Sequence, residues 1–355
     1  GVSADAIGRL AIIVTEAATN ILRHAGRGTI ILRAVLVGDA PGVEVLALDK
    51  GPGIPDLSRA MRDGFSTSGT AGQGLGGIRR LAQVFDLYSQ RGVGTALLAR
   101  VGEEQATVVT SIDDRVGAVC IPVSGQVECG DAWRVVVQAR DRTTVMVVDG
   151  LGHGPQAAAA AAAATALLPS RPLDEAHVLL GALDEAMRGT RGAALSVTVI
   201  DVAAREAQFS GVGNVDGRVI AMGKTTHLVP QNGIIGHTMP TLRPSAVPWP
   251  AGGRLIMHSD GVSARWHMDA YPGLLAAHPA LVAGVIYRDF ARGRFGAVRT
   301  VHKIHLPAGA EVAAPAPADL GERLDCDVTG DDHAHPHVVA VDIGRGQLGE
   351  DEIAL

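Results

Sequence analysis

The residues most able to support chemistry are acids placed at the ends of apolar runs. Residues 145–154 read Val-Met-Val-Val-Asp-Gly-Leu-Gly-His-Gly, and the first four predict a buried strand. Asp149 ends this strand, Gly150 follows it, and Pro155 suits the first turn of a helix. A fixed carboxylate beside a main-chain carbonyl that glycine leaves accessible suits a hard divalent cation. A strand–turn–helix joint with an incidental acid explains the stretch equally well.

Two further acids repeat this arrangement. Asp131 precedes the strand-like residues 133–137, Asp260 follows the strand-like residues 255–257, and each acid adjoins a glycine. If these acids converged with Asp149, their charges would repel one another. A pair of divalent ions would remove that repulsion and would lower the pKa of a bridging water to roughly 7. The three acids together therefore predict metal-assisted hydrolysis.

Five motifs in chain order resemble the SpoIIE/RsbX-like branch of the metal-dependent serine/threonine phosphatases: Cys129-Gly-Asp-Ala-Trp133, Asp149-Gly-Leu-Gly-His-Gly154, Ser210-Gly-Val-Gly-Asn214, Gln231-Asn-Gly-Ile234 and His258-Ser-Asp-Gly261. The resemblance implies a four-layer αββα phosphatase sandwich over residues 115–294. It also implies two Mn²⁺ or Mg²⁺ ions held by Asp131, Asp149, the Gly150 carbonyl and Asp260. Their bridging hydroxide would attack phosphoserine or phosphothreonine in line, and Asp149 would count as a catalytic residue as well as a metal ligand.

Other polar side chains in these motifs have plainer explanations. His153 is better explained as a turn histidine facing water than as an acid on the phosphate side. Asn214 and Asn232 stand beside glycines, as turn residues do. Cys129 is better explained as a small buried hydrophobic residue than as a nucleophile.

A second group of polar residues lies near the start of the chain. Glu16, Asn20 and His24 are four residues apart, so a helix over residues 10–24 would place them on one face. A solvated polar stripe explains the same spacing. After two predicted strands, a glycine-rich loop over residues 66–77 leads into another helix, and free N–H groups at a helix start bind phosphate. The loop is neither a Walker loop nor a Rossmann turn.

The order of these pieces resembles the GHKL ATP-binding fold, specifically the RsbT-like serine kinases and anti-sigma factors. The resemblance implies an ATP-binding α/β sandwich over residues 1–101, in which Glu16 would be the catalytic base and Asn20 would hold Mg²⁺. It further implies roles for Asp49 at the adenine amino group, Gly51 and Gly53 in the adenine pocket, Gly72, Gly74 and Gly76 around the phosphates, and Thr95 near the base. A degenerate site is the alternative. Family members carry an extra strand and helix before the first helix, and this chain begins inside that region.

The two resemblances predict an α+β bacterial signalling protein. Its first half would phosphorylate a serine or threonine on a partner, and its second half would remove such phosphates. By resemblance, the partners would be phosphorylated antagonist proteins of a stress-response or sigma-factor switch. A different class of function is a binding module, in which the ATP domain clamps a partner or regulates the phosphatase without phosphotransfer. A third possibility is a phosphatase made inert by its altered terminus.

The end of the chain breaks the phosphatase pattern. Residues 287–294 resemble the approach to the family's last metal acids, but no Asp-Asp pair follows at once. One account is a long insertion before Asp331 and Asp332 and a strand over residues 338–343, which restores the missing ligand. The other is a replaced, disordered terminus over residues 295–355, which their Pro/Ala-rich composition favours.

Composition narrows the classes of function. The chain has 355 residues, which favours two domains, and 47% of them are hydrophobic. Its net charge of −6 without a basic run argues against nucleic acid or an anionic membrane surface as a partner. Three cysteines without metal-type spacing favour a reducing cytosol. Because no apolar run is long enough to span a bilayer, we expect a cytoplasmic protein.

Overall fold

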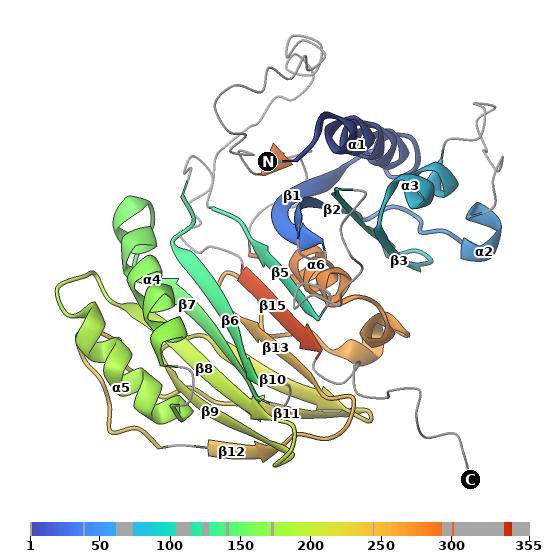
Figure 1. Cartoon of the computed structure of the whole chain (residues 1–355). Helices are drawn as coiled ribbons and strands as arrows, with labels where there is room; N and C mark the ends of the chain where they lie inside the picture. The colour runs from blue at the N-terminus through green and yellow to red at the C-terminus, as the bar shows by residue number, and fades with distance from the viewer. Residues whose placement is uncertain are drawn as a thin grey trace. The chain divides into compact units, whose positions relative to one another are not determined.

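The computed structural model describes residues 2–37, 40–61, 74–103, 115–122, 128–139, 142–171, 174–243, 245–292, 300–301 and 337–342. The chain divides into two compact units. The first comprises Gly1–Asp114, Tyr271–Arg288 and Gly293–Gly330, and the second comprises Arg115–Ala270, Asp289–Arg292 and Asp331–Leu355. Helices accompany β-sheet in both units (Figure 1), which confirms the predicted mixed fold class.

The first unit contains one five-stranded sheet. Its elements are α1 (Ala4–His24), β1 (Gly28–Val37), β2 (Ala40–Asp49), α2 (Leu57–Ala60), α3 (Leu75–Leu81), β3 (Val84–Gln90), β4 (Gly94–Gly102), η4 (Leu274–Ala276), α6 (Pro279–Phe290) and β14 (Thr300–Val301). The strand order is β14-β1-β2-β4-β3. All pairs are antiparallel except that of β1 with β14.

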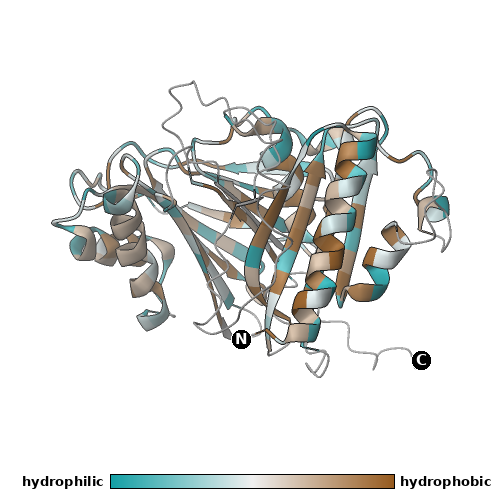
Figure 2. Cartoon of the chain, turned by 90° about the horizontal axis from the view of Figure 1, so that it is seen from above, coloured by the Kyte–Doolittle hydropathy of each residue, from teal (hydrophilic) through white to brown (hydrophobic). Residues whose placement is uncertain are grey.

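Helix α1 covers one face of this sheet. Ser3 caps its start by accepting a hydrogen bond from the Ala6 N–H. The buried residues recur every three or four positions: Ala6, Leu10, Ile13, Ala17 and Ile21. They pack on apolar residues of β1, β2 and β4, and Figure 2 shows teal and brown residues mixed along α1 over mostly brown strands. Glu16 and Asn20 flank this stripe and are half-buried, whereas His24 is exposed.

Helix α6 lies on the opposite face of the same sheet. Val45 and Ala47 pack in the core under α1, so the alternate residues Leu46 and Leu48 face the other way. A Cβ added to Gly284 of α6 would lie 2.9 Å from Leu46 and 3.0 Å from Leu48. Although α6 falls in the range predicted for the phosphatase domain, it therefore belongs to the first unit as far as Arg288.

An ion network is buried in this sheet. Glu44 of β2 is the cross-strand partner of Arg33 on β1 and Arg100 on β4. Its carboxylate lies 3.0 Å from Arg33 Nε and 2.7 Å from Arg100 Nη2. Burial by itself raises the pKa of Glu44, but the charges and hydrogen bonds of the two arginines lower it to about 2.

The second unit contains two sheets. Its elements are β5 (Val116–Cys120), β6 (Asp131–Ala139), β7 (Arg142–Gly150), α4 (Pro155–Leu167), η2 (Leu168–Ser170), α5 (Ala176–Met187), β8 (Ala193–Asp201), β9 (Glu206–Val212), β10 (Asp216–Ala221), β11 (Lys224–Leu228), β12 (Ser245–Pro248), β13 (Arg254–His258), η3 (Met268–Ala270) and β15 (His337–Asp342). One sheet has the order β12-β9-β8-β7-β6 and the other β11-β10-β13-β15-β5.

Alternation along β8 shows how the second unit is layered. Leu195, Val197 and Val199 join the core cluster that includes residues of α4 and α5. Thr198, which points the other way, contacts Met257 of β13 in the second sheet at 3.5 Å. One face of the first sheet is thus covered by helices and the other by the second sheet. The alanines on α4 allow the close approach to β7, because small side chains need little space between backbones.

Strand β15 lies in the part of the chain for which the sequence left two accounts open. Residues 337–342 pair antiparallel with β13 on one side and β5 on the other, in the interior of the sheet. A strand is therefore present where the account with an insertion expects one, over residues 338–343. Asp331 and Asp332 lie outside the described residues.

Candidate functional site

Strand register brings two of the predicted acids together. Asp131 begins β6, Asp149 stands near the end of β7, and the two are direct cross-strand partners. Met146 and Val148 of β7 face the helices, so Asp149 points to the other side, toward the second sheet. Cross-strand partners share a face, and Asp131 therefore lies on that side too. Asp260 directly follows β13 of the second sheet.

The buried environment of Asp131 feels the charges of the other two predicted acids. Its side chain is only 3% exposed. Burial raises the pKa of this carboxyl well above its usual range, and the charges of Asp149, Cys129 and Asp260 raise it further. The neighbouring Ser259 side chain lowers this pKa and so acts in the opposite direction. We name Asp131, Asp149 and Asp260 the acid site.

Two side chains that the sequence did not assign to the acid site contribute to it. Asn214 donates its side-chain N–H to Asp260 Oδ2 at 2.6 Å, so it orients this carboxylate rather than only forming a turn. Ser259 acts on the pKa of Asp131, although its neighbour Asp260 was the residue singled out. Their positions inside two quoted motifs were the available signal. His153 and Asn232 are exposed.

Gly150 is required by close packing at the acid site. Its N–H donates to the Gly130 carbonyl at 3.2 Å, which ties the ends of β6 and β7. A Cβ at this position would collide with the carbonyl oxygen of Ala157 in the first turn of α4. The left-handed Gly154, with φ 75°, then starts the helix together with Pro155.

The donor chemistry of the acid site fits a hard divalent cation. Carboxylates at strand ends are oxygen ligands, and their mutual repulsion is relieved by positive charge. Among the described residues, however, no group of three or more His, Cys, Asp or Glu side chains already stands in the arrangement of a metal centre. The site therefore offers suitable ligands without a finished cage.

A second set of predicted residues meets around Asp49 at the end of β2. Asp49 Oδ1 accepts hydrogen bonds from the N–H groups of Gly51 at 2.8 Å and Thr95 at 3.2 Å. Burial raises the pKa of this carboxyl, and these two bonds partly oppose the rise. Ser89 extends the cluster, because its hydroxyl lies 3.0 Å from Thr95 Oγ1 and accepts from Ile54 N at 2.7 Å. We name Asp49, Gly51, Gly53 and Thr95 the Asp49 site.

Backbone approach explains the glycines of the Asp49 site. Gly53 has φ 70° and would place a Cβ against the Gln90 carbonyl. Gly94, with φ 136°, would place one against the carbonyl oxygen of Asp49. That carbonyl also accepts a hydrogen bond from Arg288 Nη1 at 3.0 Å, although Arg288 lies on α6, 239 positions further along the chain.

The structure describes some, but not all, of the other residues predicted to bind the nucleotide. Gly74 precedes α3, and Gly76 is buried within that helix. Gly72 lies outside the described residues. The end of α1, which carries Asn20, lies next to the Asp49 site, because a Cβ on Gly51 would meet Ala25 at 2.7 Å.

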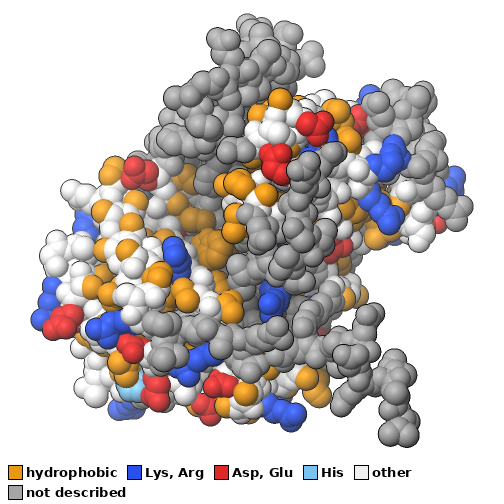
Figure 3. All heavy atoms as spheres, in the orientation of Figure 1, with side chains coloured by type: hydrophobic (Ala, Val, Ile, Leu, Met, Phe, Trp, Pro, Cys, Tyr) orange, Lys and Arg blue, Asp and Glu red, His pale blue; other side chains and the backbone are white. Residues whose placement is uncertain are grey.

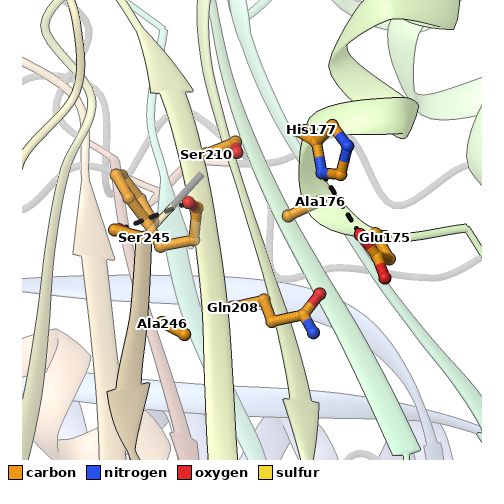
Figure 4. Close-up of a pocket in the computed structure, with 8 residues that line it drawn as sticks. Glu175, Ala176, His177, Gln208, Ser210, Ser245 and Ala246 are labelled. Carbon is orange, nitrogen blue, oxygen red and sulfur yellow. Dashed lines mark hydrogen bonds and ion pairs between the residues drawn. The ribbon is translucent and has the colours of Figure 1, made fainter. Parts of the chain in front are cut away.

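A cleft elsewhere in the second unit shares none of the predicted site residues. It has ≈ 410 Å³ of empty space between the start of α5 and strands β9 and β12, and Figure 4 shows its lining side chains. In this cleft His177 Nδ1 lies 3.4 Å from Glu175 Oε2. On the face drawn in Figure 3, acidic and basic side chains are interspersed over the described surface. Across the described residues, no helix combines the length and apolar character needed to cross a membrane.

Each half of the chain is similar to a different group of known proteins. The family model of the histidine kinase-like ATPase domain matches residues 1–101, and that of stage II sporulation protein E (SpoIIE) matches residues 139–279. Serine/threonine-protein kinase RsbT of Bacillus subtilis (strain 168) is 44% identical over 91 residues, which cover 26% of this chain and 68% of RsbT. Phosphoserine phosphatase RsbX of the same organism is 27% identical over 143 residues, which cover 39% of this chain and 70% of RsbX.

Among solved structures, RsbX in complex with magnesium matches with a TM-score of 0.46 and 15% identity, over 65% of this chain and 98% of that one. The two family models and the two relatives define a kinase-like ATPase domain fused to a PP2C-type serine/threonine phosphatase domain of the SpoIIE class. The chain belongs to the RsbT-like family of histidine kinase-like ATPase domains.

Proposed function

We propose that the second unit is a metal-dependent phosphatase acting on phosphoserine or phosphothreonine in proteins. The observation that carries this proposal is the cross-strand pairing of Asp131 with Asp149, which puts two predicted ligands on one face of the sheet, while Asp260 closely follows β13 of the other sheet. Two Mn²⁺ or Mg²⁺ ions, held by these acids and the Gly150 carbonyl, would offset the repulsion. Such ions lower the pKa of a bound water to roughly 7 and so supply hydroxide at neutral pH. The similarity to RsbX supports this assignment.

The residues of this chain would then have distinct tasks. Asp149 and Asp131 lie opposite each other on neighbouring strands, and both would hold cations beside the phosphate. Asn214 would keep Asp260 in one orientation through its 2.6 Å hydrogen bond. Ser259 would do the same for Asp131. An ordered carboxylate is a better ligand, because no rotamer freedom is lost when the cation binds.

Hydrolysis of a phosphoserine peptide tests this proposal. We expect release of phosphate that requires Mn²⁺ or Mg²⁺ and is lost in Asp149→Ala. Asp269→Ala is the matched control, since Asp269 is an exposed acid of the same unit. Hydrolysis that persists in Asp149→Ala, or without divalent ions, would reject the assignment.

We infer that the first unit binds ATP with Mg²⁺ and transfers phosphate to a serine or threonine of a partner. The Asp49 site supports adenine binding, because both backbone N–H groups reach Oδ1 and leave Oδ2 to accept from the adenine amino group. Asn20 would hold Mg²⁺, and Glu16, one helical turn earlier, would take the proton of the attacking hydroxyl. The partner would be an antagonist protein of a sigma-factor or stress-response switch, in line with the similarity to RsbT.

Incubation with ATP, Mg²⁺ and a candidate antagonist tests the transfer. Glu16→Gln should abolish phosphate transfer while leaving ATP affinity within about twofold, because the change removes the base and keeps the shape. Asp5→Asn is the control on the same helix, since Asp5 is exposed. Transfer that survives in Glu16→Gln would exclude the proposed base.

One contact favours a second candidate, in which nucleotide regulates the phosphatase without phosphotransfer. Arg288 bonds the Asp49 carbonyl in the first unit. The residues that follow it belong to the second unit, where Ser263 N donates to the Phe290 carbonyl at 2.8 Å and Arg292 N to the Gly261 carbonyl at 2.7 Å. Gly261 directly follows Asp260. Residues 288–292 therefore begin at a side chain bonded to Asp49 and end at a backbone group bonded next to Asp260.

The phosphatase rate with and without a non-hydrolysable ATP analogue tests this second candidate. Regulation predicts that the analogue changes the rate and that Arg288→Met abolishes its effect, whereas Arg265→Met, at an exposed position, does not. An unchanged rate on saturation with the analogue would reject regulation and leave the transfer hypothesis standing.

A further inference from the structure

Two thiols face each other beside the acid site. Cys120 ends β5, and Cys129 lies two residues before β6. Their sulfur atoms are 2.9 Å apart, and both residues are partly exposed. Cys129, expected as a small buried hydrophobic residue, is thus half-buried beside a second thiol. A disulfide has an S–S distance of about 2.05 Å, so the sulfurs need to approach by less than about 1 Å to become bonded.

The pair links the edges of the two sheets of the second unit. β5 is the edge strand of one sheet and β6 that of the other. Cys120 Sγ also lies 3.5 Å from the carbonyl oxygen of Asp131. Cys129 is connected to Asp131 through Gly130, whose carbonyl accepts the Gly150 N–H. Movement of Cys129 would therefore reach the backbone that carries the acid site.

We propose that Cys120 and Cys129 form a reversible intrachain disulfide that inhibits the phosphatase. A hydroperoxide is the oxidant: one thiol sulfur attacks its O–O bond, giving a sulfenic acid and releasing the first water or alcohol. The second thiol then attacks the sulfenic sulfur, the S–S bond forms, and water leaves. Two thiols are oxidised as one hydroperoxide is reduced, and a dithiol reductant reverses the reaction by exchange.

Inhibition follows from the position of the cross-link. The approach of the sulfurs draws the segment before β6 toward β5, and Asp131 is the first residue of that strand. A displacement of about 1 Å at a reacting centre can lower the rate by about 100-fold. We expect a loss of at least about tenfold, since part of the movement is taken up by β5. This consequence rests on the proposed phosphatase function, whereas formation of the disulfide does not.

Treatment of the full chain with hydrogen peroxide tests the proposal through two separate readouts. Peptide mass mapping should find Cys120 joined to Cys129, with two hydrogen atoms fewer, and dithiothreitol should remove the link. Phosphopeptide hydrolysis should fall and recover in parallel. Cys120→Ser should keep its basal activity and resist peroxide, whereas Cys326→Ser, which leaves the pair intact, should respond like the parent chain.

Each contrary outcome has a distinct meaning. Absence of the Cys120–Cys129 peptide after oxidation overturns the proposal, as does a disulfide that leaves hydrolysis unchanged. If Cys120→Ser does not fold, Cys129→Ser and mapping of the unaltered chain still decide the matter. If the untreated chain hydrolyses no phosphopeptide but the disulfide forms, the proposed phosphatase function has failed and the redox pair has not.

Discussion

Replacing Asp131 with asparagine should stabilise the metal-free protein while removing its metal response. Asparagine keeps the shape of the side chain but carries no charge. The Asp131 carboxylate that it replaces is only 3% exposed, and Asp149 and Asp260 repel its charge. A buried polar group that is incompletely compensated costs about 1–3 kcal/mol, and a charged group costs more. We therefore expect a gain of about 1–2 kcal/mol at neutral pH.

Thermal denaturation in EDTA and in Mn²⁺ measures both effects. A gain of that size raises the midpoint by about 2–8 °C for a unit of this length. A cation at 100 times its Kd stabilises the unaltered chain by about 2.7 kcal/mol, so the order of the two proteins should reverse when Mn²⁺ is added. Asp269→Asn, at an exposed position, should change neither value. The reasoning is refuted if Asp131→Asn is the less stable protein in EDTA, or if Mn²⁺ stabilises both proteins equally.

Three other predictions follow from single contacts. Glu44→Gln should lower the free energy of unfolding, because it leaves buried Arg100 without its counter-charge. The lowering of the Glu44 pKa from 4.5 to about 2 corresponds to a loss of roughly 3 kcal/mol. Since the folded-state pKa of Glu44 is lowered, the parent chain should hold this stability above about pH 4.5 and lose it as the pH falls toward 2, as urea titrations can show. Asn214→Ala should lower phosphatase activity by about tenfold and weaken Mn²⁺ affinity, because Asp260 loses its orienting bond; unchanged affinity in a Mn²⁺ titration would contradict this. Gly94→Ala should abolish nucleotide binding in calorimetry, because its Cβ would displace the Asp49 carbonyl beside the proposed adenine pocket.

Local sequence patterns were sufficient for much of the architecture. The three- and four-residue spacing of apolar positions in α1 and the apolar run before Asp149 determined a helix and a strand, since both signals act between near neighbours. The glycine and proline after Asp149 likewise located the start of α4. Motif order was enough to indicate both families before any contact was known.

Contacts between distant residues required the folded chain. Asn214 and Asp260 are 46 positions apart, and Arg288 and Asp49 are 239 apart, so no periodicity could pair them. Pro279 begins α6 shortly after η4 ends, so residues 272–292 do not form a single helix. Pro supplies no N–H to continue a preceding helix, but it is favoured in a first turn.

The sequence by itself determined which residues carry charge, thiol or glycine, and in which local element each of them stands. Only the tertiary structure decided that Asp131 and Asp149 share a face, that Cys129 faces Cys120, and that residues 337–342 fill the middle of a sheet. The physical reason is that strand register is set by packing across the whole sheet. A shift of one residue would turn every side chain of a strand to the opposite face, and nothing in the strand's own sequence forbids it.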